Sequence, residues 1–434
     1  MFHGTFDEFR LESFNFSSRW ITLTRSRWTI IAVLFATWLI SYFDRSLIAT
    51  ALPFIGRDFG LSPALKGFVS SAFFIGYAAV QIPGGVLADR VGPRRVAFGA
   101  VLGWSIFCAL TGAAGSILTL ITVRILFGLT EGAFSPASWK VLSMTVDETN
   151  RARANALMLT SNLFGPALAP IVLAPFIASI GWRPAFWCLA VPGIFAAFIC
   201  MKYLPATTKR SETNDGAQNE TSATAAAPIS MRKALMNPVI GKLFLIWGTW
   251  DITWWGFISW VPSYLYSGRA FSLEKTGLLA SLPFAVGILG MLGAGYAADR
   301  IAKRRTVIMI CLIGNATFLT LLAFAKSPGA AIACLIGVGF FLPAMYGPFW
   351  SLPMQLVPSS LMGAGAGLIN FAGQLAGFIS PIVIGWTIAV TGTYTAGFLF
   401  LAAAAVICFL ITASLREPNK EVPQPATTVS SASR

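Results

Sequence analysis

The chain has 434 residues, of which 56% are hydrophobic and 11% are charged, and its mean hydropathy is +0.72. An ordinary soluble domain carries about 25% charged residues, so this composition excludes a disordered chain, a disulfide scaffold and a typical cytosolic enzyme. A polytopic membrane protein is the class that keeps so much apolar surface in one chain. The formal net charge of +14 raises the question of nucleic-acid binding, which depends on where the charges lie.

Twelve apolar stretches can be placed along the chain, each close to the ~20 residues that a bilayer requires. The sequence therefore predicts an all-α membrane protein with 12 transmembrane helices, at 28–50, 67–88, 95–114, 117–139, 154–179, 184–204, 240–265, 276–298, 306–325, 329–350, 361–389 and 395–415.

The Lys and Arg residues are distributed unevenly between the two sides of the membrane. With the N-terminus inside, most of the 31 fall in segments predicted to be cytoplasmic, and Arg45 and Arg124 lie within spans. The few on the outer side are Arg57, Lys66, Arg183, Arg269, Lys275 and Lys326. This positive-inside bias places both termini in the cytoplasm. The basic charge thus reflects topology, and we expect no nucleic-acid partner.

The metal-ligating and nucleophilic residue types are sparse. The six cysteines all lie in predicted spans without a C-x-x-C pair, and we interpret them as small core residues. The one histidine, His3, lies in an N-terminal tail that lacks the features of a cleaved signal peptide. We therefore expect no metal, no cofactor and no enzymatic activity.

A polar break divides the chain into two halves. We expect cytoplasmic tails at 1–27 and 416–434, six-helix bundles at 28–204 and 239–415, and a largely disordered cytoplasmic linker at 205–238. The halves are related by a spacing of 210 residues, which pairs Ser62 with Ser272, Gly67 with Gly277, Phe74 with Phe284, Gly85 with Gly295, Asp89 with Asp299, Arg90 with Arg300, Arg94 with Arg304 and Arg95 with Arg305. Such duplication is typical of secondary transporters, whose pseudo-symmetric halves rock around a central site.

Several motifs extend this interpretation to a family. GVLADRVGPRR (85–95), its second-half copy GYAADRIAKRR (295–305) and RILFGLTEG (124–132) resemble signatures of the major facilitator superfamily. The second copy departs from the pattern at Ala302 and Lys303. More narrowly, SYFDRS (41–46), SAFFIGYAAVQIPGG (71–85), ISWVPSYL (258–265) and GPFWSLP (347–353) resemble the anion:cation symporters. The resemblance implies a bacterial inner-membrane carrier that takes up organic anions such as hexuronate, galactonate, glucarate or aromatic carboxylates with protons.

Charged side chains within spans are costly and mark functional sites. Arg124 and Glu131 are seven residues apart and share a helix face, so the arginine can grip a carboxylate and the buried glutamate can take up a proton. Asp44 and Arg45 are adjacent near the predicted outer end of the first span, and must find separate partners. The resemblance implies substrate binding by Arg124, proton coupling by Asp44 and Glu131, and an essential role for Arg45, which we expect to bind substrate as well. Structural ion pairing is the alternative for both sets.

Further candidates line helix faces in spans two, seven and eleven. Tyr77 with Gln81, and Asn370 with Gln374, are spaced by four residues and could contact substrate hydroxyls. Leu163 stands where sugar-acid members of the family tend to carry glutamine, which argues against a heavily hydroxylated substrate. Span seven reads WGTWDITWWGFISW (247–260): its tryptophans form an aromatic wall or, at Trp260, an interfacial anchor. Asp251 is a third protonation site, a cation site or a partner of Arg45 or Arg124.

The features shared by both halves indicate gating. Gly85, Asp89, Arg90, Arg94, Asp299 and Arg300 lie at cytoplasmic helix ends, where carboxylates can bind helix N-termini and arginines while the carrier faces outward. The leading function is proton-coupled uptake of an organic carboxylate by a monomer that needs only protons, the anion and the bilayer. Efflux by antiport and a non-transporting sensor are the alternatives.

Overall fold

The computed structural model describes residues 27–147, 150, 154–155, 157–158, 160–206, 232–301 and 303–415. Within these ranges the regular secondary structure is entirely helical. The predicted tails, apart from residue 27, and most of the predicted linker lie outside the described residues.

The helices coincide with the predicted spans. The first half contains α2 (Arg27–Asp58), α3 (Pro63–Arg90), α4 (Pro93–Ala113), α5 (Ile117–Thr145), α7 (Ser161–Ile180) and α8 (Trp182–Tyr203). The second half contains α10 (Pro238–Ser263), the π-helical turn η1 (Tyr264–Gly268), α11 (Leu273–Ile301), α12 (Arg304–Phe324), α13 (Pro328–Ala344), α14 (Tyr346–Trp350), α15 (Pro353–Leu356), the 3₁₀ turn η2 (Ser359–Leu361), α16 (Met362–Thr391) and α17 (Thr395–Ala413).

Length and hydropathy qualify 11 segments of the described chain as membrane spans, with α13 to α15 forming one of them. The twelfth, α10, is long enough but too polar to qualify on composition, because it carries tryptophans and Asp251. The prediction of an all-α membrane protein with twelve spans is confirmed in the described chain.

Side-chain caps define where several helices begin. Ser62, Ser116 and Ser327 accept hydrogen bonds from backbone N–H groups three residues on, at 3.3, 3.2 and 3.1 Å, and Asn237 caps α10 in the same way. These residues satisfy donors that a helix N-terminus leaves free. Short connections, such as the one between α3 and α4, make consecutive helices antiparallel.

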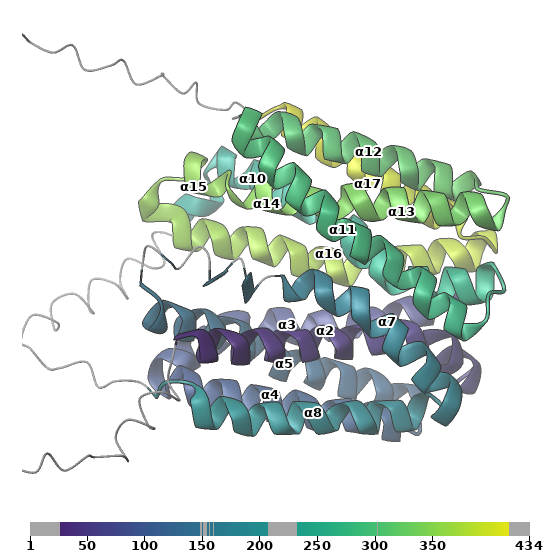
Figure 1. Ribbon diagram of the computed structural model, residues 1–434, viewed down its shortest axis with the longest axis horizontal. Coiled ribbons are helices and arrows are strands. Elements are labelled where there is room, and N and C mark those ends of the chain that lie inside the picture. Colours follow the sequence, from purple (N-terminus) through teal and green to yellow (C-terminus); the bar gives the residue numbers. More distant parts are fainter. Residues whose placement is uncertain are drawn as a thin grey trace, which may run out of the picture.

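The six helices of the first half lie together, purple to teal, and those of the second half lie beside them, green to yellow (Figure 1). Across the boundary α3 packs against α16, α7 against α11 and α2 against α10. The core of each half is built mainly from apolar side chains, with a few buried charged groups in the first half, and the boundary between the halves also carries polar and charged groups. That boundary is where a secondary transporter places its substrate.

On the outer side of the membrane the two halves touch through a contact that the internal repeat uses twice. A Cβ atom on Gly67 of α3 would lie 2.3 Å from the carbonyl oxygen of Pro381 on α16. A Cβ atom on Gly277 of α11 would lie 2.4 Å from the carbonyl oxygen of Pro170 on α7. Because only glycine allows this approach, the repeat-related pair Gly67 and Gly277 closes the outer side.

Two expectations about helix positions need correction. The first span was expected to end near residue 50, but α2 continues to Asp58, so Asp44 and Arg45 lie in the middle of the helix rather than near its outer end. The tenth span is not one helix: its α13, α14 and α15 segments are separated at Met345 and at 351–352. Pro348 and Pro353 lack the backbone N–H that would continue the hydrogen-bond ladder. This break places Tyr346 and Trp350 at the boundary between the halves.

The cysteines follow the prediction with one exception. Five are buried within helices, but Cys188 on α8 is exposed, on the outside of the bundle rather than in the core.

Candidate functional site

A cavity of about 480 Å³ lies between the two halves and is lined by residues from both. Trp139, Met354 and Gly367, at the cytoplasmic ends of α5, α15 and α16, line one end of it. Because the outer side is closed by the glycine contacts described above, the cavity faces the cytoplasm. The structure is therefore inward-facing.

Arg45 and Glu131 form an ion pair at the wall of this cavity. The Arg45 guanidinium donates from Nε (2.7 Å) and Nη2 (2.5 Å) to the same oxygen, Oε1 of Glu131. The Ser41 hydroxyl donates to that oxygen as well, at 2.6 Å. Arg45 is 8% exposed and lines the cavity, whereas Glu131 is fully buried behind it. The guanidinium is thus the part of this pair that a ligand reaches first.

Aromatic rings surround the Arg45 guanidinium. Its central carbon lies 5.2 Å from the ring centroid of Tyr42, 4.8 Å from Phe73, 5.0 Å from Tyr77 and 5.5 Å from Trp255. These distances are within the range of cation–π attraction, which holds a cation in a site with little water. The boundary between the halves therefore already surrounds one organic cation, the guanidinium of Arg45, with aromatic rings.

Asp44 and Arg124 lie deeper in the first half. The Cys108 thiol donates to Oδ1 of Asp44 at 3.3 Å, and Arg124 is near enough to Asp44 to interact with it electrostatically. Arg124 is 1% exposed, lies 4.6 Å from the ring centroid of Phe127, and does not line the cavity. Its Nε and Nη1 have no hydrogen-bond partner in the described chain. In this conformation Glu131 pairs with Arg45 rather than with Arg124.

Most of the predicted polar contacts gather at the cavity. Tyr77, Asn370 and Gln374 line it, and Gln81 lies next to it. The Nδ2 of Asn370 donates to Oε1 of Gln81 at 3.3 Å, which links α16 to α3 across the boundary. The predicted pairs on spans two and eleven therefore meet each other.

The second half contributes an aromatic wall from α10. Trp247, Trp250, Trp254 and Trp255 line the cavity around Asp251, and Trp250 and Trp254 stack with their centroids 5.5 Å apart. Trp250 is fixed by a hydrogen bond from Nε1 to the Leu342 carbonyl at 2.8 Å.

Trp260 does not act as an interfacial anchor, contrary to expectation. It is 2% exposed and donates to the Pro381 carbonyl at 3.1 Å. Because α10 continues into η1, Trp260 lies inside the outer contact between the halves and not at a helix end.

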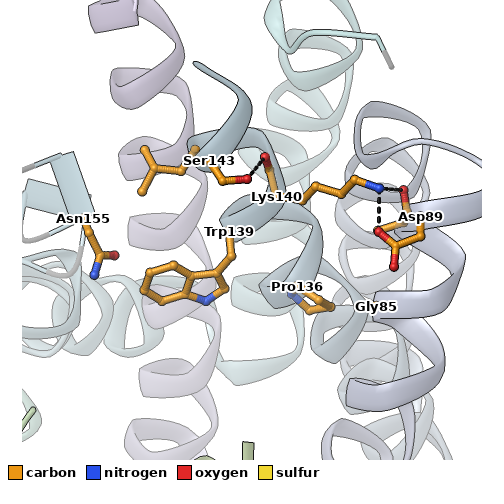
Figure 2. Close-up of a pocket in the computed structure, with 9 residues that line it drawn as sticks. Gly85, Asp89, Pro136, Trp139, Lys140, Ser143 and Asn155 are labelled. Atoms are coloured by element: carbon orange, nitrogen blue, oxygen red, sulfur yellow. Dashed lines mark hydrogen bonds and ion pairs between the residues drawn. The ribbon is translucent and has the colours of Figure 1, made fainter. Parts of the chain in front are cut away.

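The predicted gating residues lie at the cytoplasmic ends of α3 and α11 and, for Arg94, at the start of α4. Asp89 forms an ion pair with Lys140 of α5 at 2.6 Å, and Lys140 also donates to the Ala88 carbonyl at 3.0 Å. Figure 2 shows this pair beside Gly85 in a surface pocket of the first half. In the second half, Arg300 donates to the Tyr296 hydroxyl at 3.1 Å.

None of the hydrogen bonds or ion pairs formed by these residues in the described ranges crosses the boundary between the halves. Asp299 forms no ion pair within the described part of the chain. Arg90 is exposed, and the Nε of Arg94 has no hydrogen-bond partner among the described residues. In the inward-facing state the described residues of this motif thus form no hydrogen bond or ion pair with the other half.

Among the residues of the site that were not anticipated, Ser41 and Tyr346 form hydrogen bonds there. Ser41 completes the hydrogen bonding of Glu131, and its spacing of four residues from Arg45 on one helix face was an available signal. Tyr346 lines the cavity and accepts a hydrogen bond from Nδ2 of Asn162 at 3.4 Å, across the boundary. No local pattern marks Tyr346, because the break after α13 decides where it points.

Comparison with known proteins agrees with this architecture. The family model described as Major Facilitator Superfamily matches residues 34–381. A solved bacterial homologue of the lysosomal transporter Spinster, in an inward-facing and occupied conformation, superimposes with a TM-score of 0.71 at 17% identity. The superposition covers 89% of this chain and 95% of the solved chain. At this identity the likeness concerns the fold.

Curated relatives share most of their length with this chain. A probable sulfoacetate transporter of Cupriavidus necator is 29% identical and covers 87% of this chain and 91% of its own. A hexuronate transporter of Bacillus subtilis is 26% identical, over 89% of this chain and 94% of its own. A D-galactonate transporter of Escherichia coli is 28% identical, over 88% of this chain and 94% of its own. These relatives match the anion:cation symporter type that the motifs indicate. With its duplicated helical halves, central cavity and matching family model, the chain belongs to the major facilitator superfamily, as a multi-pass inner-membrane transporter and not an enzyme.

Proposed function

We propose that this transporter takes up an organic carboxylate together with protons, by alternating access. The observation that carries the proposal is the Arg45–Glu131 pair, an arginine that faces the cavity and is held by a fully buried carboxylate. A planar guanidinium at a dry site is suited to binding a carboxylate through two parallel hydrogen bonds. The relatives named above carry sulfoacetate, hexuronate and galactonate, and all three are organic acids.

The same pair couples the anion to a proton. While Glu131 is ionised, it occupies Nε and Nη2 of Arg45. A proton on Glu131 weakens this pairing and releases the guanidinium for the carboxylate of the substrate. By linkage, a bound carboxylate favours the protonated form of Glu131 to the same extent. Asp44, one residue before Arg45 and buried beside Arg124, serves as a second proton site on the same path.

The lining of the cavity favours an acid with few hydroxyl groups. Leu163 lines it, as do four of the five tryptophans of α10, and apolar and aromatic surfaces of this kind bind rings and alkyl groups better than polyols. The amide groups of Asn370 and Gln374 remain for a small number of polar contacts.

Uptake into proteoliposomes tests the proposal. The panel contains labelled sugar acids, sulfoacetate, benzoate-type acids and short alkyl carboxylates, each with and without an inwardly directed proton gradient. We expect at least one acid to accumulate only with the gradient, and to exchange with unlabelled acid without it. Accumulation of the acid driven by an outwardly directed proton gradient would indicate antiport. Binding without exchange would indicate a sensor and contradict the proposal.

A further inference from the structure

The wall of the cavity that belongs to the second half carries a charge without a partner. Asp251 is 5% exposed, lines the cavity, and forms no hydrogen bond or ion pair with any residue in the described ranges. Arg45, the other charged lining residue of those ranges, is already paired with Glu131. An isolated buried carboxylate is strongly disfavoured within a membrane. A proton or a cation from outside the described chain must therefore accompany it.

The surroundings of Asp251 favour an organic cation. Trp247, Trp254 and Trp255 are four residues before it and three and four residues after it, so they flank it on one face of α10. All three are buried and line the cavity. The face of an indole ring attracts cations and repels anions because of its quadrupole. The tryptophan rings and Asp251 thus both favour a cation at this wall, and the Trp255 ring already contacts the guanidinium of Arg45.

The neighbouring helix of the same half, α16, leaves room for the Asp251 carboxylate without offering it a donor. Gly373 of α16 faces it, and a Cβ atom there would lie 2.1 Å from Oδ2 of Asp251. A metal ion such as Na⁺ or Ca²⁺ requires several oxygen ligands, and indole rings do not supply them. A weakly hydrated cation, such as a quaternary ammonium or an alkylated ring nitrogen, fits one carboxylate and an aromatic wall.

The two walls of the cavity therefore have opposite polarity, with Arg45 in the first half and Asp251 in the second. We propose that the substrate is a zwitterion, whose carboxylate binds Arg45 and whose organic cation binds Asp251 beside Trp247 and Trp254. This inference rests on the proposed function for its carboxylate end and adds the cationic end.

Binding of matched acid pairs tests the inference on the full chain in detergent, by calorimetry or by quenching of tryptophan fluorescence. Each pair has one shape and one carboxylate but differs by a positive charge. The pairs are glycine betaine with 3,3-dimethylbutanoate, N-methylnicotinate with 3-methylbenzoate, and N-methylisonicotinate with 4-methylbenzoate. We expect the zwitterion of at least one pair to bind about tenfold more tightly than its partner. Equal or tighter binding of the uncharged partner in every pair, or no binding by any of the six, would overturn the inference.

The variant Asp251→Asn removes the charge and keeps the shape. We expect the two members of the preferred pair to converge in affinity, because the zwitterion loses its advantage. A preference that survives in this variant would overturn the inference. If Asp251→Asn does not fold, Trp254→Leu provides a second variant, in which the preference should shrink several-fold. The wild-type comparison needs no variant at all.

The outcomes also separate this inference from the proposed function. If uncharged acids bind and are accumulated by a proton gradient, and no zwitterion is preferred, the proposed function stands and the inference fails. If Asp251→Asn then also abolishes the gradient-driven uptake of those acids, Asp251 is a proton site. If the sugar acids and sulfoacetate of the earlier panel and the six pair members all fail to bind, both proposals fail.

Discussion

Arg45 holds Glu131 by one oxygen alone. Oε1 accepts from Nε and Nη2 of Arg45, whereas Oε2 is buried and has no hydrogen-bond partner in the described chain. An arginine that served only to neutralise the glutamate would gain more from bonding both oxygens in a fork. In the proposed coupling, the free oxygen receives the proton while the other oxygen stays in contact with Arg45.

Replacement of Glu131 by glutamine should separate exchange from accumulation. Glu131→Gln mimics the protonated acid, so Arg45 stays available to the substrate and labelled anion should still exchange with unlabelled anion. Uptake driven by a proton gradient should fall to the level of passive equilibration, because the coupling proton is lost. Counterflow and gradient-driven uptake in the same proteoliposomes measure the two activities. Accumulation at the wild-type level would make Glu131 structural.

Asp44→Asn is the companion to that variant. Because Asp44 lies next to Arg45 in the sequence but binds Cys108 instead, we expect it to impair driven uptake and to slow exchange moderately. Normal driven uptake in Asp44→Asn would leave Glu131 as the proton site by itself.

The two arginines should differ in their effect on substrate affinity. Arg45→Lys keeps the charge but loses the paired donors, so the affinity should fall by about 1.5–3 kcal/mol, which is roughly 10-fold to 150-fold. Arg124→Lys should weaken binding less, because Arg124 does not line the cavity. Titration of the substrate in detergent gives both affinities. Equal losses would show that Arg124 reaches the carboxylate in another conformation, as the motif around it predicts.

The outer glycine contact should control which side of the carrier is open. Gly67→Ala places a methyl group against the Pro381 carbonyl and should disfavour the inward-facing state by about 1–3 kcal/mol. Gly277→Ala should act in the same way at the repeat-related contact. Gly99→Ala, on α4 with no atom near its Cβ position, is the matched control.

Spin labels at exposed positions 57 and 326, on the outer side of the two halves, measure this shift. When the outer side opens, the two labels move apart. We expect the population with the longer label-to-label distance to increase in Gly67→Ala and Gly277→Ala but not in Gly99→Ala. An unchanged distance distribution in both variants would show that the outer contact is not a gate.

Removal of the Asp89 carboxylate should slow turnover more than it weakens binding. Asp89 is on the cytoplasmic surface, far from Arg45, and in the inward-facing state it binds Lys140 of its own half. We propose that its contact with the other half forms in the outward-facing state, which Asp89→Asn would destabilise. The maximal rate of uptake should fall several-fold while the affinity for substrate stays within about twofold. Loss of binding in a folded variant would contradict this assignment.

The sequence predicts the fold because its signals are local. A span needs about 20 apolar residues, and the repeat is visible as a constant spacing, so neither depends on contacts between distant segments. The partner of Arg45, by contrast, depends on contacts between segments that are distant in the sequence. Glu131 and Arg124 share a face of α5, and only the rotation of α2 against α5 decides that Glu131 meets Arg45. The length of α2 beyond residue 50 also depends on packing, so the middle position of Asp44 was not predictable. Pro348 and Pro353 are visible in the sequence, but the direction in which the break turns Tyr346 depends on packing, so its cavity position was not predictable.

The low hydropathy of α10 has a consequence for how the protein is made. Segments that are apolar enough enter the bilayer on their own as they leave the translocation channel, whereas tryptophans and an aspartate near the centre of a helix reduce that tendency. The helix buries Asp251 against Gly373 of α16, a helix that is synthesised more than a hundred residues later. We therefore expect Asp251 to reach its final surroundings only when α16 has been made, and α10 to depend on neighbouring helices until then. The feature that shapes the cavity thus links the insertion of the seventh span to a helix made later.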